Sequence, residues 1–135
     1  MVKRDVKMAK MLFVCVENSC RSQMAEGFDR KFGGDKLEVF SAGSKPSGTV
    51  NPDAVLVMKE IGIDITGQVS KGFEQLPYNK FDYIVTMGCQ DVCPYFPAKE
   101  KVDWQIEDPK GKGLEVFGRV RDEIKKKIEE WISAI

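Results

Sequence analysis

Short apolar runs alternate with amphipathic stretches along most of the chain, and this alternation predicts its secondary structure. Runs rich in apolar, β-branched or aromatic residues are typical of buried strands, and apolar residues at every third or fourth position are typical of helices. In the first helical stretch, Met24, Phe28 and Phe32 form the apolar side, and Glu26 and Asp29 fall on the polar side. The pattern predicts strands at residues 11–15, 37–43, 81–87 and 101–106, and helices at residues 23–32, 52–61 and 114–135.

The order of these elements predicts an α/β fold. Strands that alternate with helices favour a single four-stranded parallel sheet with helices on both faces, a Rossmann-like three-layer arrangement. We expect residues 10–135 to form this one domain and the charged, unpatterned residues 1–9 to form a short N-terminal extension. Ligands of such sheets bind beyond the carboxyl ends of the strands, where Cys15, Asp108 and the loop after the third strand all fall.

Composition and charge exclude several classes of function. A chain of 135 residues with 42% hydrophobic and 31% charged residues is typical of one soluble globular domain. Its 21 basic residues balance 21 acidic ones, so no general affinity for nucleic acid is expected. No apolar run approaches the ~20 residues of a membrane span, and residues 1–8 lack the apolar core of a signal peptide. We therefore expect a cytoplasmic protein that binds neither nucleic acid nor membrane.

The stretch between the first strand and the first helix carries the clearest chemistry. Backbone N–H groups at a helix N-terminus lack partners, and the helix dipole presents positive charge there, so an oxyanion binds favourably at this position. Arg21 adds a planar charged fork, and Ser22 can donate a hydrogen bond to a thiolate at Cys15. This field also favours thiolate over thiol, which makes Cys15 a candidate nucleophile. The predicted anion-binding residues are Val16, Glu17, Asn18, Ser19, Cys20 and Arg21.

The cysteines leave more than one chemistry open. Four cysteines in an intracellular chain argue against a structural disulfide framework and for metal or redox chemistry. Zinc is one alternative, because Cys15, Cys20, Cys89 and Cys93 can be counted as two pairs. The chain has no histidine, however, and Cys20 lies inside the loop that carries Arg21, where a cation would be repelled. We therefore predict no metal ion and no cofactor.

The residues from Cys15 to Gly27 resemble a known family. A strand that ends in Cys15, followed by Arg21, Ser22 and a helix, is similar to the low-molecular-weight protein tyrosine phosphatase superfamily. The run from Asn18 to Gly27 looks more like the arsenate reductases of that fold than the phosphatases. The resemblance extends from about residue 10 to the C-terminus. It implies the fold of that superfamily and a general acid at Asp108, which precedes a proline as in its relatives.

The resemblance also raises the question of a potassium ion, which some relatives bind behind the loop. Asn18, Glu26 and Ser41 match that pattern. Val69 and Lys71, however, stand where Thr and Asp would be expected, and Lys71 would compete with the cation. No potassium site is therefore predicted.

As an arsenate reductase, the chain would reduce arsenate to arsenite. Cys15 would attack arsenic, Asp108 would protonate the departing oxygen, and phosphate or sulfate would act as mimics of the substrate. Cys89 and then Cys93 would carry the electrons in an intramolecular thiol–disulfide relay, which a thioredoxin-like donor would recycle. The spacing of Cys89 and Cys93 is shorter than in many thioredoxin-coupled relatives. The order of the two thiols and the final reductant, thioredoxin or glutaredoxin with glutathione, therefore stay open.

Three further alternatives accompany this hypothesis. A phosphatase would use Cys15, Arg21 and Asp108 to hydrolyse phosphate monoesters and would need neither Cys89 nor Cys93. A lysine at position 110, where these phosphatases commonly have an aromatic residue, fits an aryl phosphate less well. A non-catalytic oxyanion or redox sensor would use the cysteine pair as a switch. Cys20 could form a regulatory disulfide with Cys15, although packing at the start of the helix is the interpretation we favour.

Overall fold

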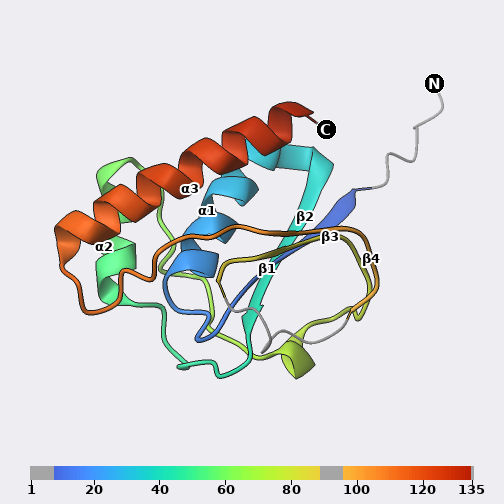
Figure 1. The fold of residues 1–135 in the computed structure, drawn as a ribbon, viewed down its shortest axis with the longest axis horizontal. Helices are drawn as coiled ribbons and strands as arrows, with labels where there is room; N and C mark the ends of the chain where they lie inside the picture. The colour runs from blue at the N-terminus through green and yellow to red at the C-terminus, as the bar shows by residue number, and fades with distance from the viewer. Residues whose placement is uncertain (1–7, 89–95, 135) are drawn as a thin grey trace.

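A four-stranded parallel sheet forms the centre of the molecule (Figure 1). The computed structural model describes residues 8–88 and 96–134. The order of the strands in the sheet is β2-β1-β3-β4, and all three neighbouring pairs are parallel, as the sequence predicted. The strands are β1 (Ala9–Cys15), β2 (Leu37–Gly43), β3 (Phe81–Thr86) and β4 (Ala98–Asp103). The helices are α1 (Arg21–Gly33), α2 (Pro52–Glu60) and α3 (Leu114–Ala134). Two short 3₁₀ turns are η1 (Gly34–Lys36) and η2 (Phe73–Gln75).

The two faces of the sheet are covered differently. Side chains of α1, α2 and α3 form one core with Met11, Phe13 and Val85 of the central strands. On the other face, Leu12 and Val14 pack in a smaller core with apolar side chains of η2 and its surroundings. Of the helices predicted on both faces, the three described α-helices thus lie on one face, and the described part of the second face carries only the turn η2. Part of the long connection from β2 to β3 lies on this second face, where Phe73 of η2 and Leu76 just after it pack against the smaller core together with Phe96.

The fourth strand lies earlier in the chain than its apolar residues suggested. β4 spans Ala98–Asp103, whereas the sequence pattern predicted residues 101–106. The strand lies at the edge of the sheet, and Lys99 is among its exposed side chains, so it carries little hydrophobic signal. Trp104 and Ile106, which drew the prediction, are buried in the core just beyond the strand. The prediction was therefore wrong by about half the length of the strand.

The first helix is buried on more sides than its pattern predicted. Glu26 and Asp29, expected on a polar face, are 4% and 0% exposed. Helix α1 is covered by β2 on one side and by α3 on another, so its polar side also faces protein. The amphipathic pattern located the helix correctly but did not tell which of its polar residues reach water.

The last two helices follow their sequence signals closely. The side chain of Asn51 caps α2 by accepting a hydrogen bond from the backbone N–H of Asp53 at 2.8 Å. Helix α3 buries Phe117, Val120, Ile124 and Ile128 and turns charged residues outward. Among the described residues, no helix is both long enough and apolar enough to cross a membrane.

Candidate active site

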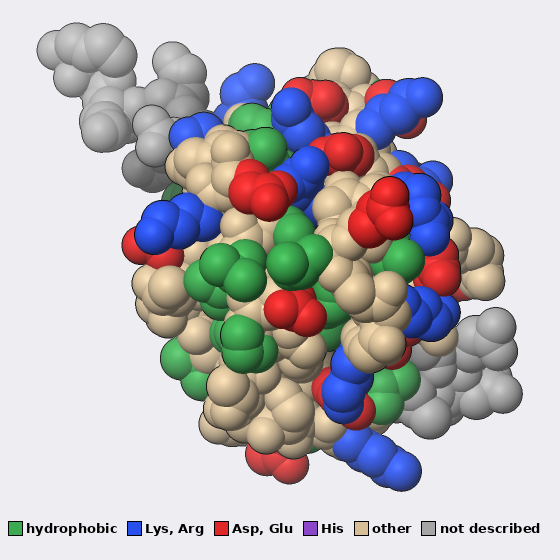
Figure 2. All heavy atoms as spheres, turned by 90° about the vertical axis from the view of Figure 1, so that its left-hand side faces the viewer, with side chains coloured by type: hydrophobic (Ala, Val, Ile, Leu, Met, Phe, Trp, Pro, Cys, Tyr) green, Lys and Arg blue, Asp and Glu red, His purple; other side chains and the backbone are tan. Residues whose placement is uncertain are grey.

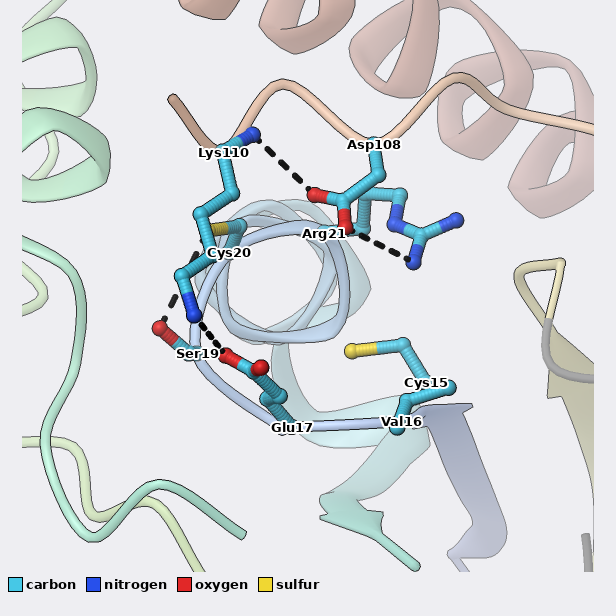
Figure 3. Close-up of a pocket in the computed structure, with 8 residues that line it drawn as sticks. All are labelled: Cys15, Val16, Glu17, Ser19, Cys20, Arg21, Asp108 and Lys110. Atoms are coloured by element: carbon cyan, nitrogen blue, oxygen red, sulfur yellow. Dashed lines mark hydrogen bonds and ion pairs between the residues drawn. The ribbon is translucent and has the colours of Figure 1, made fainter. Parts of the chain in front are cut away.

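The end of β1, the loop after it and the loop between β4 and α3 enclose a small cavity (Figure 3). Its volume is about 210 Å³, which is below the ~300–1,000 Å³ of sites for drug-sized ligands. A cavity of this size suits a small anion. It is lined by Cys15, Val16, Glu17, Ser19, Cys20, Arg21, Asp108 and Lys110.

The sulfur of Cys15 is hydrogen-bonded to the side chain of Ser22. The two side-chain atoms lie 2.8 Å apart, and Ser22 is fully buried. The amide of Asn18 donates to the same Ser22 Oγ at 2.8 Å. Because that bond occupies a lone pair of the hydroxyl, the hydroxyl proton is available for the sulfur. The Ser22 hydroxyl is thus held against the sulfur of Cys15, the predicted nucleophile.

The orientation of Asn18 is fixed by contacts that the sequence analysis did not identify. Its Oδ1 accepts from the backbone N–H of Lys71 and from Nε2 of Gln23, each at 2.9 Å. Gln68 in turn donates to Oε1 of Gln23 at 2.8 Å. The amide donors therefore point in one direction, from Gln68 through Gln23 and Asn18 to Ser22, which is itself bonded to Cys15. Such chains polarise one another and reinforce the final bond.

The backbone of the anion loop turns its carbonyl groups away from the cavity. Carbonyl oxygens of the loop accept hydrogen bonds from neighbouring segments, at distances from 2.8 to 3.1 Å. Their donors include the backbone N–H groups of Lys45, Ser47 and Asn51. Gly43, at the end of β2, permits this close approach, because a Cβ there would lie 2.4 Å from the carbonyl oxygen of Val16. With the negative ends of its peptide groups bonded elsewhere, the loop is suited to an anion.

Arg21 is held at the wall of the cavity by backbone groups. Its Nη1 donates to the carbonyl oxygens of Met87 and Ile106, the latter at 3.0 Å, and Nη2 lies 3.8 Å from a carboxylate oxygen of Asp108. A Cβ at residue 88 would lie 2.8 Å from Nη1, so the glycine there, with a φ of +87°, leaves room for the guanidinium. The fork is therefore fixed before any substrate arrives.

The two cysteines of the loop differ in their environment. Burial raises the pKa of the Cys20 thiol to about 11, although a hydrogen bond with Ser19 opposes this shift. Cys20 therefore stays protonated near neutral pH and is a poor nucleophile. This agrees with the interpretation that Cys20 packs at the start of α1.

A charged cluster lies behind the loop, where the relatives' potassium pattern was considered. Glu26 accepts a hydrogen bond from Ser41 at 2.5 Å, pairs with Arg30, and lies 3.9 Å from the ammonium of Lys71. Burial lowers the pKa of Lys71, and Glu26 opposes this shift. The carboxylate of Glu26 thus already interacts with two cationic side chains, those of Arg30 and Lys71. Among the described residues, no group of three or more cysteine, aspartate or glutamate side chains could hold a metal ion.

A second hollow lies on the side of the molecule that carries α2. Its volume is about 660 Å³, and it is lined by residues 48–50, α2 and residues 66–70. Figure 2 shows hydrophobic side chains gathered on this side, and Leu56 and Val69 are 50% and 57% exposed. Neither a charged side chain nor a cysteine lines this groove. The cavity at Cys15 is therefore the candidate active site.

The structure brings most of the predicted site residues together. Cys15, Arg21 and Asp108 border one cavity, with Ser22 bonded to Cys15, and all the predicted anion-loop residues except Asn18 line the cavity wall. Asn18 is buried behind the loop instead. Cys89 and Cys93 lie outside the described residues, so the predicted relay stays a prediction, and the zinc alternative that was set aside is not tested by the described residues.

Comparisons with known proteins agree with this geometry. Residues 10–135 match the family described as low molecular weight phosphotyrosine protein phosphatase. The glutaredoxin arsenate reductase of Synechocystis sp. is 43% identical over 131 residues, which cover 95% of this chain and 99% of that protein. This chain belongs to the arsenate reductases of the low molecular weight phosphotyrosine protein phosphatase family.

Solved structures of this enzyme family show the same fold. An arsenate reductase in a phosphate-binding state has a TM-score of 0.84 and 42% identity, and the match covers 95% of this chain and 99% of that one. A thioredoxin-dependent arsenate reductase of Corynebacterium glutamicum has a TM-score of 0.78 and 31% identity, and the match covers 97% of this chain and 63% of that one. The predicted family and the predicted α/β fold with a four-stranded parallel sheet are therefore confirmed.

Proposed function

We propose that this arsenate reductase works through Cys15 as nucleophile and through Cys89 and Cys93 as a thiol–disulfide relay. The observation that carries the proposal is the geometry at Cys15. Its sulfur lies 2.8 Å from the hydroxyl oxygen of Ser22, to which it is hydrogen-bonded, and borders a cavity that Arg21 and Asp108 also line. A nucleophile, a cation and a carboxyl group thus converge on a space the size of a small oxyanion.

The first half-reaction forms a bond between sulfur and arsenic. Arsenate binds among the N–H groups of residues 16–21, with Arg21 on its oxygens. The thiolate of Cys15 attacks arsenic, and one arsenic–oxygen bond breaks. Asp108, whose side chain is 52% exposed at the rim, gives its proton to the departing oxygen. The product is a covalent adduct of Cys15 with arsenic still in its oxidised state.

The second half-reaction transfers two electrons. The thiolate of Cys89 attacks the sulfur of Cys15 and forms a disulfide with it. The electron pair of the broken sulfur–arsenic bond stays on arsenic, which leaves as arsenite. Cys93 then attacks Cys89, so Cys15 is released as a thiolate and the oxidised pair is Cys89–Cys93. A thioredoxin-like dithiol reduces that pair and is itself oxidised.

The names of two relatives support an external thiol donor, but they indicate different donors. One is a glutaredoxin arsenate reductase, and another is thioredoxin-dependent. We propose a donor of the thioredoxin-like class for this chain. Assays with each purified donor system, at equal concentrations of arsenate, would distinguish them by the rate of arsenite formation.

Two cysteine variants test the relay. Cys93→Ser should form one arsenite per chain and then stop, because the disulfide between Cys15 and Cys89 cannot be passed on. Cys89→Ser should form no arsenite but should still hydrolyse a phosphate ester, which needs only Cys15, Arg21 and Asp108. Undiminished steady-state turnover by Cys93→Ser would rule out the relay, and loss of ester hydrolysis in Cys89→Ser would show that the variant has damaged the site.

A further inference from the structure

Lys110 reaches from the loop after β4 to the anion loop across the cavity. Its Nζ lies 2.7 Å from Oε1 of Glu17, a residue 93 positions earlier in the chain. Both side chains line the cavity (Figure 3). The hydrogen bond with Glu17 raises the pKa of Lys110, so the ammonium stays charged. The pair therefore joins the two loops at one side of the cavity.

A second connection joins the same two loops on the other side. The backbone N–H of Lys110 donates to a carboxylate oxygen of Asp108 at 3.1 Å, and the other oxygen of Asp108 lies 3.8 Å from Arg21. In Figure 3 the sulfur of Cys15 points into the space between these two connections. An anion above this sulfur is thus framed by Arg21 and Asp108 on one side and by Glu17 and Lys110 on the other.

We propose that the ion pair between Glu17 and Lys110 makes the site selective for small inorganic oxyanions over phosphate esters. The inference rests on the proposed function, because it assumes that the anion binds above Cys15. An inorganic oxyanion presents only oxygen atoms and fits within the frame. The organic group of an ester must leave the cavity between the two loops, where it meets the pair.

The penalty for an ester has a steric and an electrostatic part. If the organic group displaces Lys110, the carboxylate of Glu17 is left unpaired beside a bound dianion, which it repels. Both side chains are partly exposed, 39% for Glu17 and 51% for Lys110, and exposed ion pairs are weak. The contribution of the pair to selectivity is therefore modest, roughly three- to fivefold in relative affinity.

The test compares the binding of two probes, inorganic phosphate and phenylphosphonate, by calorimetry. Phenylphosphonate carries an aromatic group and is not hydrolysed, so neither probe requires turnover. The first variant, Glu17→Ala with Lys110→Ala, removes the pair without changing the net charge of the site. The second, Glu17→Lys with Lys110→Glu, restores a pair of reversed polarity. Lys112→Ala is the matched control, because Lys112 lies in the same loop but pairs with Glu107 at 3.0 Å, away from the cavity.

The expected result is a change in the ratio of the two affinities. The double-alanine variant should improve binding of phenylphosphonate relative to phosphate by roughly three- to fivefold. The reversed pair should return the ratio toward that of the unaltered protein, and Lys112→Ala should leave it unchanged. An unchanged ratio in the double-alanine variant, or an equal change in Lys112→Ala, would overturn the proposal. Because no turnover is measured, this result is independent of whether the protein forms arsenite, which tests the proposed function separately.

Discussion

Asp29 gives the sharpest prediction about stability. This residue of α1 is fully buried, and neither carboxylate oxygen has a hydrogen-bond partner among the described residues. Burial raises the pKa of its carboxyl group from 3.8 to about 7. A buried group that resists ionisation makes the folded state less stable at any pH where the unfolded chain would release the proton. Replacing Asp29 with Asn removes the ionisation and keeps the shape.

The direction and size of the effect follow from the two pKa values. Below pH 3.8 both states hold the proton, and the ionisation has no effect on stability. As the pH rises from 3.8 to about 7, the unfolded state loses the proton first, so the free energy of unfolding falls. At 1.36 kcal/mol per unit, the loss is about 1.5 kcal/mol near pH 5 and about 4 kcal/mol near pH 8, where it is complete.

Urea unfolding at about pH 5 and about pH 8 measures this effect. The gain in free energy of unfolding from Asp29→Asn should be larger at the higher pH by roughly 2–3 kcal/mol. Asp122→Asn serves as the control, because Asp122 is an exposed aspartate on α3. A gain that is the same at both pH values, or a variant that is destabilised only at the higher pH, would refute the assignment of a raised pKa to Asp29.

Two further substitutions test the geometry of the site. Asn18→Ala removes the amide that orients Ser22, so alkylation of Cys15 at neutral pH should slow about fivefold, as followed by mass spectrometry of the Cys15 peptide. The exposed Asn79→Ala is the control, and an unaltered rate in Asn18→Ala would count against the role of Asn18. Gly88→Ala places a Cβ against Arg21, so the affinity for phosphate, measured by calorimetry, should fall about tenfold. Gly111→Ala is the control and should not change this affinity, because Gly111 also has a positive φ but no described atom lies within 4 Å of a Cβ there. Equal losses of affinity in both variants would implicate backbone strain alone.

The sequence predicted the parts of the fold that depend on local pattern. The apolar run before Cys15 and the spacing of apolar residues in α3 each identify an element without knowledge of its neighbours. The predictions failed where packing against other elements determines which residues are buried or where a strand lies. Asp29 is buried because α1 is packed between other elements, and β4 is an edge strand whose exposed charged residues carry no strand pattern. Neither property can be read from a single segment.

The same distinction applies to the site. Cys15, Arg21 and Ser22 are close in the sequence, so the chemistry of their spacing could be recognised. The contact of Gln68 with Gln23 spans 45 positions, and that of Lys110 with Glu17 spans 93, with no sequence signal for either. Long-range contacts of this kind depend on the tertiary fold. They supply the orientation of Asn18 and the frame around the anion.

The cysteine linkages formed in a single exposure to arsenate show whether the relay operates. Fully reduced protein is mixed with arsenate in the absence of any other thiol, and the cysteine linkages are mapped by mass spectrometry while arsenite is counted. We predict about one arsenite per chain and a disulfide between Cys89 and Cys93, with Cys15 free. Arsenite without any disulfide, or a disulfide that excludes both Cys89 and Cys93, would contradict the account.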